Sequence, residues 1–220
     1  MKSKILLLVS SLLILAALAM VFVFVPTEAN QGVIQRIFYF HVPVAWVAFF
    51  AFFVTFAAGI MYLAKRNPFW DMLACISAEI GLIFTTLVLI TGSIWGRSFW
   101  GIWWTWDARL TSSLVLWLIY IAYFIIRAYI SEEEHKARFA AVVGIIGFVD
   151  VPIVALAIQL APTTHPEAGI FQGGVKGLML VTLLLSISAF TALYVLFMAV
   201  GISIKKDERD LAGIKEAMKE

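Results

Sequence analysis

Six long apolar runs constrain this chain more than any other feature of its sequence. A helix that crosses a bilayer needs about 20 consecutive apolar residues. Hydrophobic residues make up 63% of the 220 residues and charged residues only 14%, which is more apolar surface than a soluble fold could bury. The sequence therefore predicts an all-α integral membrane protein, a single polytopic domain over residues 1–220. Its six transmembrane helices are expected at residues 5–25, 44–64, 72–94, 111–130, 139–160 and 177–204.

The first apolar run has one property of a signal peptide, because Lys2 and Lys4 precede it. Its apolar stretch is about 20 residues long, however, whereas the core of a signal peptide has roughly 7–15 residues. No Ala-x-Ala cleavage site follows the run. We therefore expect a retained transmembrane helix.

The lysines and arginines predict how the helices are oriented. With both termini placed in the cytoplasm, the inner segments carry 12 Lys and Arg residues and the outer segments carry four. This is a clear positive-inside bias. The outer face is then formed by residues 26–43, 95–110 and 161–176. The net charge of +2, with no basic run, makes nucleic acid an unexpected partner.

The middle outer segment, over residues 95–112, is rich in tryptophan. Tryptophan is enriched at membrane surfaces in general, but such a belt spreads over all helix ends. If the segment is helical, Trp100, Trp103 and Trp104 share one face, which would form a flat apolar shelf for a planar ligand. The residues alone leave both interpretations open. Five of the eight tryptophans lie here: Trp95, Trp100, Trp103, Trp104 and Trp106.

Two of the three histidines are candidate metal ligands. His135 lies in an inner charged run, where we expect it to be solvated, but His41 and His165 lie in outer segments on either side of the tryptophan-rich segment. A single histidine is more often structural than a ligand, and two on one face make both roles equally plausible. Imidazole suits iron, copper and zinc. Zinc usually takes more protein ligands than two, whereas a haem leaves two axial positions open.

Three outer arginines suit the propionates of a haem. Arg97 and Arg109 bracket the tryptophans, and Arg36 lies five residues before His41. Arginine forms bidentate pairs with carboxylates. The alternative is a local pair between Arg109 and Asp107. Asp107 is also placed to cap the fourth helix.

Two acids lie at membrane depth, Glu79 in the third predicted helix and Asp150 in the fifth, two residues before Pro152. Ionisable groups there are costly and are functional candidates by default. We expect both acids to have a structural pairing role.

Residues 95–112 read WGRSFWGIWWTWDARLTS and resemble the WWD signature of haem-handling proteins. YFHVPVAW at residues 39–46 and DVPI at residues 150–153, with His165 downstream, resemble the cytochrome c maturation protein C family (CcmC, haem exporter protein C). The resemblance extends over about residues 30–195. One departure is QLAPTT at residues 159–164, where the family carries tryptophans shortly before the second histidine.

The resemblance implies a protein of the cytoplasmic membrane that holds b-type, non-covalent haem at its outer face. His41 and His165 would be the axial ligands and Trp100–Asp107 part of the haem platform. The implied partners are the ABC transporter subunits CcmA and CcmB, the small membrane subunit CcmD and the haem chaperone CcmE, which receives the haem. No covalent chemistry is required, so we expect no enzyme. The alternatives are a membrane b-type cytochrome subunit of a redox enzyme and a purely structural permease partner, which leaves the tryptophans unexplained.

Overall fold

The computed structural model describes residues 2–160 and 175–218 of the chain. In those residues it consists of six long helices and contains no β-strand. A π-helix η1 (Met20–Phe24) and a 3-10 helix η2 (Val33–Ile37) lie between the first helix and the second. The long helices are α1 (Lys2–Ala19), α2 (Phe38–Lys65), α3 (Pro68–Trp100), α4 (Ala108–Tyr129), α5 (Glu133–Leu160) and α6 (Gly177–Ala217).

All six helices are long and apolar enough to cross a membrane, the first of them together with η1 and the second together with η2. A lipid environment favours this outcome, because an α-helix satisfies its own backbone hydrogen bonds where no water can do so. The prediction of an all-α membrane protein with six spanning helices is confirmed.

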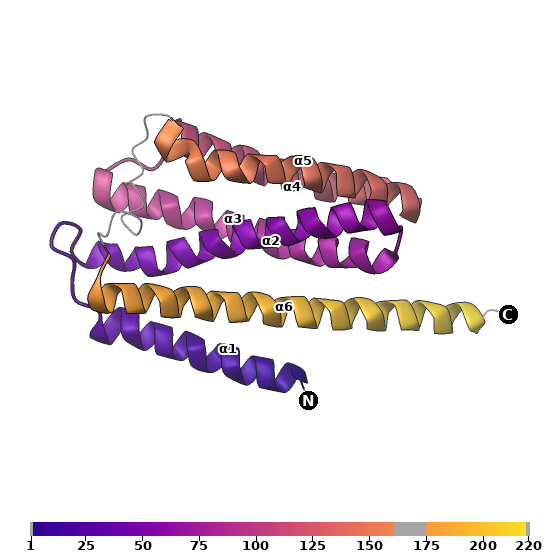
Figure 1. Cartoon of the computed structure of the whole chain (residues 1–220), viewed down its shortest axis with the longest axis horizontal. Coiled ribbons are helices and arrows are strands. Elements are labelled where there is room, and N and C mark those ends of the chain that lie inside the picture. The colour runs from indigo at the N-terminus through magenta and orange to yellow at the C-terminus, as the bar shows by residue number, and fades with distance from the viewer. Residues whose placement is uncertain (1, 161–174, 219–220) are drawn as a thin grey trace.

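α2 lies at the centre of the bundle, where it packs against α3, α5 and α6 (Figure 1). α4 packs against α5 and α3, and α1 packs along α6. Small side chains let α2 and α3 approach closely, as is typical of membrane helices. Ala48 and Ala51 of α2 and Ala78 of α3 are all buried, and the Ser77 hydroxyl donates a 2.7 Å hydrogen bond to the Ala51 carbonyl.

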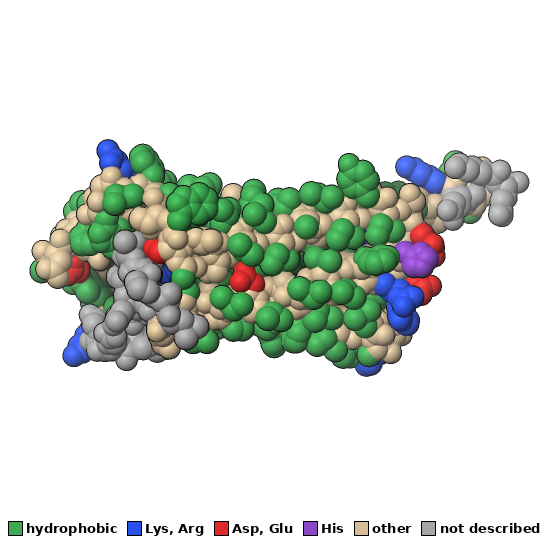
Figure 2. Space-filling model, turned by 90° about the horizontal axis from the view of Figure 1, so that it is seen from above, with side chains coloured by type: hydrophobic (Ala, Val, Ile, Leu, Met, Phe, Trp, Pro, Cys, Tyr) green, Lys and Arg blue, Asp and Glu red, His purple; other side chains and the backbone are tan. Residues whose placement is uncertain are grey.

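The connections between helices gather at two opposite ends of the bundle (Figure 1). One end carries η2, the α3–α4 connection and the beginning of α6. The other end carries the α2–α3 and α4–α5 connections and the C-terminus. Charged side chains lie mainly towards these ends, with a long apolar belt between them (Figure 2). The connections are thus grouped as the predicted topology requires, with predicted outer segments at one end and predicted inner segments at the other.

α6 continues to Ala217, beyond the predicted end at residue 204, but the departure that affects the outer segments concerns α3. We expected this helix to end at residue 94 and a loop to cover residues 95–112, but α3 continues to Trp100. The helix ends where Gly101 adopts a φ of 78°, a left-handed conformation that glycine reaches without steric cost. Trp95 and Trp100 are therefore helical, and residues 101–107 form the non-helical part of the segment.

The expected pairing of the two membrane-depth acids is not found. Glu79 is exposed on α3, and no hydrogen bond or ion pair joins it or Asp150 to the described part of the chain. The paired acid is instead Asp71, in the first turn of α3. Its two carboxylate oxygens accept hydrogen bonds of 2.6 and 2.9 Å from the Arg127 guanidinium near the end of α4. Such a bidentate pair is among the stronger side-chain interactions.

Candidate functional site

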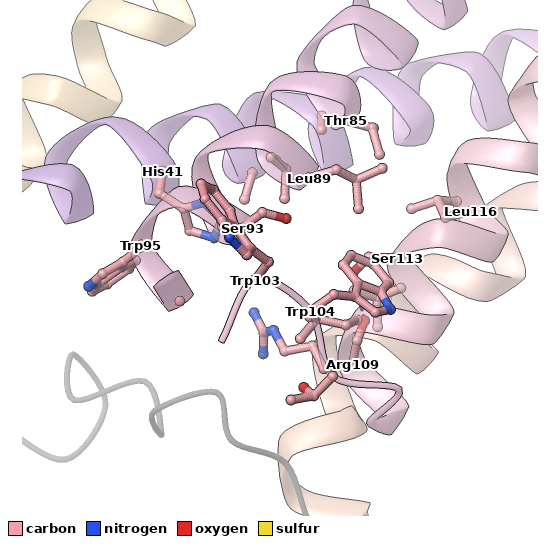
Figure 3. Close-up of a pocket in the computed structure, with 18 of the residues that line it drawn as sticks. His41, Thr85, Leu89, Ser93, Trp95, Trp103, Trp104, Arg109, Ser113 and Leu116 are labelled. Carbon is pink, nitrogen blue, oxygen red and sulfur yellow. Dashed lines mark hydrogen bonds between the residues drawn. The ribbon is translucent and has the colours of Figure 1, made fainter. Parts of the chain in front are cut away.

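A pocket opens between the first turns of α2 and α4 and the last turns of α3 (Figure 3). Residues 102–105 of the α3–α4 connection and Val154 of α5 complete its walls. Its lining is mainly apolar, and the residues that contribute a hydroxyl, imidazole or guanidinium group are His41, Thr85, Ser93, Thr105, Arg109 and Ser113. A mainly apolar pocket with a few converging polar groups is typical of a small-molecule site.

His41 lies in the first turn of α2 and forms one wall of this pocket. Its side chain is buried, and its Nδ1 atom lies 2.8 Å from the Thr91 hydroxyl of α3. The Trp95 ring packs edge-on against the imidazole, with the ring centroids 5.7 Å apart. Trp95 is itself fixed, because its Nε1 donates a 3.1 Å hydrogen bond to Gln31 Oε1 in the segment before η2. The imidazole is therefore held in one orientation.

Four of the five clustered tryptophans line the pocket: Trp95, Trp100, Trp103 and Trp104. The segment is not one continuous helix, so the condition for a shared helical face of Trp100, Trp103 and Trp104 is not met. All three nevertheless line the pocket. Trp103 and Trp104 point to different sides of the pocket, Trp104 towards Ser113 of α4 (Figure 3). The Trp104 indole N–H is buried and has no hydrogen-bond partner within residues 2–160 and 175–218.

Asp107 begins α4 and shapes the pocket rim. Its Oδ1 accepts hydrogen bonds of 3.0 Å from the backbone N–H groups of Arg109 and Leu110, and its Oδ2 accepts one from the Thr105 hydroxyl at 2.9 Å. These bonds satisfy donors that the start of a helix leaves open, so the predicted capping role is confirmed.

Arg109 projects its guanidinium into the pocket between Trp103 and Trp104 (Figure 3). It forms no ion pair with Asp107, and within the described ranges its guanidinium donates no hydrogen bond. The pocket thus presents a cation that is available to a carboxylate ligand.

The remaining predicted residues lie outside this pocket or outside the described ranges. Trp106 is 76% exposed and Arg97 hydrogen-bonds the Gly101 carbonyl at the end of α3. Arg36 lies in η2 and does not line the pocket. His165 falls outside residues 2–160 and 175–218.

Sequence reasoning missed Thr91 and Gly92, which contact His41. The signal was weak, because both residues lie in an apolar run, 50 and 51 residues from the histidine in sequence. Continuing the helical period backward from Trp95 would have found Thr91, since residues four apart share a helix face. Gln31, the hydrogen-bond partner of Trp95, gave no signal of its own.

Comparison with known proteins gives one consistent result. The sequence model of a family described as "Heme exporter protein C" matches residues 2–213. A protein of that name from Bradyrhizobium diazoefficiens is 38% identical over 173 residues, which cover 77% of this chain and 66% of the relative. The Escherichia coli K12 protein of the same name is 33% identical, over 78% of this chain and 70% of its own length.

A mitochondrial relative from Marchantia polymorpha, whose name places it in cytochrome c biosynthesis as ccmC-like, is 33% identical over 68% of this chain. The match covers 63% of that relative. The chain thus spans about two thirds of the length of the curated relatives that it matches.

Proposed function

The chain belongs to the heme exporter protein C family, and from this premise we propose that it binds haem and delivers it during cytochrome c biogenesis. The haem is held at the outer face of the cytoplasmic membrane and is then passed to a haem chaperone. We propose the same partners as the resemblance implied, namely the ABC transporter subunits CcmA and CcmB, the small subunit CcmD and the chaperone CcmE.

The observation that carries this proposal is the meeting of three kinds of side chain in one pocket. His41 offers an imidazole, Trp103 and Trp104 offer large aromatic surfaces, and Arg109 offers a guanidinium without an acceptor in the described ranges. A haem needs an axial ligand for its iron, an apolar surface for its macrocycle and a cation for its propionates. A haem would use all three.

The remaining groups of the pocket fit haem as cargo. The buried Trp104 N–H has no acceptor in the described ranges, and a propionate oxygen would supply one. We assign the second axial position to His165, which the sequence places on the same face. We expect Arg36 and Arg97 to attract propionates at the rim rather than inside the pocket.

The cavity itself is small. It encloses about 100 Å³, whereas typical small-molecule sites have roughly 300–1,000 Å³. We infer that haem binds at the open side, against the exposed face of Trp103, and that residues 101–107 move to admit it. A site of this kind holds its cargo at the surface, from which a chaperone can take it. Burial between helices would favour electron transfer instead.

The visible absorption spectrum of the purified protein tests the proposal. His41→Ala and His165→Ala should each change the bound haem spectrum, because each removes one axial ligand. The double variant should lose axial coordination altogether. His135→Ala is the matched control, since this histidine is exposed and hydrogen-bonded to Glu132 in a charged run.

Transfer to the chaperone is measured on the same preparations. Wild-type protein loaded with haem should pass it to added CcmE, which distinguishes delivery from a resident cofactor of a cytochrome. A six-coordinate spectrum that survives the double His41/His165 substitution would contradict the ligand assignment. Haem that stays bound through redox cycling and never transfers would favour the cytochrome alternative.

A further inference from the structure

His41 is held from one side by two neighbouring residues of α3. Its Nδ1 atom lies 2.8 Å from Thr91 Oγ1. Gly92, the next residue, faces the imidazole so closely that a Cβ atom there would lie 3.2 Å from His41 Cε1 and 3.8 Å from Nδ1. The ring therefore fills a space that α3 leaves open at Gly92 and is tied to α3 at Thr91.

The hydrogen bonds of Thr91 determine which ring nitrogen of His41 carries hydrogen. A threonine hydroxyl has a single hydrogen to donate. Thr91 Oγ1 lies 2.7 Å from the Leu87 carbonyl oxygen, which can only accept. With its hydrogen donated to Leu87, the Thr91 oxygen accepts from the imidazole, so Nδ1 bears the hydrogen. In a neutral imidazole of this tautomer the lone pair lies on Nε2.

The opposite neutral tautomer is disfavoured by the same contacts. With hydrogen on Nε2, the Nδ1 atom would have to accept from Thr91, and the hydroxyl could then no longer donate to Leu87. A rotation of the ring would not avoid this loss, because Gly92 on one side and the Trp95 ring, 5.7 Å away between centroids, limit its movement. His41 is only 7% exposed, so bulk water has little access to replace the lost hydrogen bond.

We propose that Thr91 is the positioning residue for His41: it fixes the imidazole as the Nδ1–H tautomer and so makes Nε2 the atom that binds iron. Gly92 has a supporting role, because the absence of a side chain there lets the ring reach Thr91. This inference rests on the proposed function, since it assumes that His41 binds haem iron. It goes further by naming the ligating atom and the residue that selects it.

A partner of this kind has measurable consequences. Histidine ligands usually donate their second ring N–H to a hydrogen-bond acceptor, which fixes the tautomer and raises the basicity of the ligating nitrogen. Loss of such an outer partner typically weakens metal binding about 10–100-fold. A hydroxyl is a neutral acceptor and binds less strongly than a carboxylate. Thr91 therefore orients the ligand without the stronger bond that a carboxylate partner would give.

The tautomer is tested without haem. The full-length protein labelled with ¹⁵N-histidine is purified in detergent, and the imidazole nitrogen shifts are recorded. The chain has only three histidines, so His135→Ala and His165→Ala variants assign the signals. We expect His41 in the wild type to show a protonated Nδ1 and an unprotonated Nε2. Thr91→Val, which removes the acceptor at nearly constant volume, should give a mixture of tautomers.

Haem binding is then measured by absorption titration on a small set of variants. Thr91→Val should bind haem about 10–100-fold more weakly and show an altered axial-ligand spectrum. Thr91→Ser keeps a hydroxyl and should restore both. Gly92→Ala should weaken binding through displacement of the ring. The matched control is Thr182→Val in α6, where a buried threonine donates to the Leu178 carbonyl at 2.8 Å away from the pocket.

The outcomes separate this inference from the proposed function. If His41→Ala lowers haem affinity but Thr91→Val changes neither the tautomer nor the affinity, the positioning role is wrong and the proposed function stands. If His41→Ala leaves haem binding unchanged, His41 is not a haem ligand and the proposed function is contradicted on that point. A wild-type His41 that shows hydrogen on Nε2 overturns the inference whatever the haem measurements give. An equal loss of haem affinity in Thr182→Val would show that Thr91→Val acts through general destabilisation of the protein, and the positioning role would be wrong.

Discussion

At the residue scale, the pocket rim depends on two charged side chains with different roles. Asp107 uses its carboxylate locally, where it accepts hydrogen bonds from two backbone N–H groups of α4 and from Thr105. Arg109 lies two residues later and extends its guanidinium into the pocket. Asp107 thus organises the rim, and Arg109 is left to meet a ligand.

Replacing Arg109 by Met should weaken haem binding about tenfold or more. The guanidinium would lose charge-assisted hydrogen bonds to a propionate, which contribute about 1.5–3 kcal/mol, and 1.4 kcal/mol corresponds to a factor of ten. Titration with haem dimethyl ester is the control, because its propionates carry no charge. The ester should bind wild type and Arg109→Met equally well. If the variant loses haem and ester to the same degree, Arg109 acts through packing.

Asp107→Ala should lower haem retention more than it lowers membrane insertion. Loss of an N-cap residue costs about 1 kcal/mol and would loosen the first turn of α4, which carries Arg109. Asp107→Asn should recover most of the retention, because asparagine caps as well as aspartate does. Haem content per inserted protein is the measurement. An asparagine variant as defective as the alanine variant would show that the negative charge itself is required.

At the element scale, the segment over residues 101–107 separates tryptophans of different character. Trp103 and Trp104 line the pocket, whereas Trp106 is 76% exposed and does not. All three lie within four residues of one another at the same end of the bundle. A plain membrane anchor would use them alike, but a haem platform would depend on the first two.

The double variant Trp103→Ala/Trp104→Ala should therefore lose haem retention and transfer while it inserts at normal levels. Aromatic rings provide a large apolar surface against a porphyrin, and alanine leaves a gap there. Trp106→Ala is the matched control and should retain more haem than the double variant. Protein level and haem content are measured on the same membranes. Reduced protein with normal haem per molecule would indicate an anchor only.

The helices were predictable from the sequence, and their contacts were not. A run of apolar residues in lipid has few alternatives to a helix, so α2 and α5 follow from composition and length alone. The bond between His41 and Thr91 joins residues 50 apart and depends on how α2 packs against α3. Likewise, the Trp104 and Trp106 rings contact each other edge-on, as their proximity in the chain suggests, but only Trp104 lines the pocket. The sequence does not tell which side a non-helical segment presents.

At the scale of the whole molecule, the two ends of the bundle differ in chemistry. The end with the pocket carries the tryptophan-rich segment over residues 95–106, and His41 lies there. The other end carries Glu133 and Lys136, which form an exposed ion pair, and the last turns of α6, which extend beyond the other helices (Figure 1). The proposed haem delivery on one side of the membrane is consistent with this asymmetry. Its direction is a prediction that rests on the count of lysines and arginines.

Reporter fusions after residues 30, 68, 102, 134, 168 and 215 test that direction. We expect alternating signals that begin outside, because positively charged segments remain in the cytoplasm. Positions 30 and 102 lie at the pocket end and should both report outside, whereas 68, 134 and 215 should report inside. Position 168 should report outside and would place His165 on the face that His41 occupies.

An inside signal at 102 would put the pocket on the cytoplasmic face and overturn delivery to an outer chaperone. An inside signal at 168 alone would leave the pocket in place but remove His165 as its second ligand.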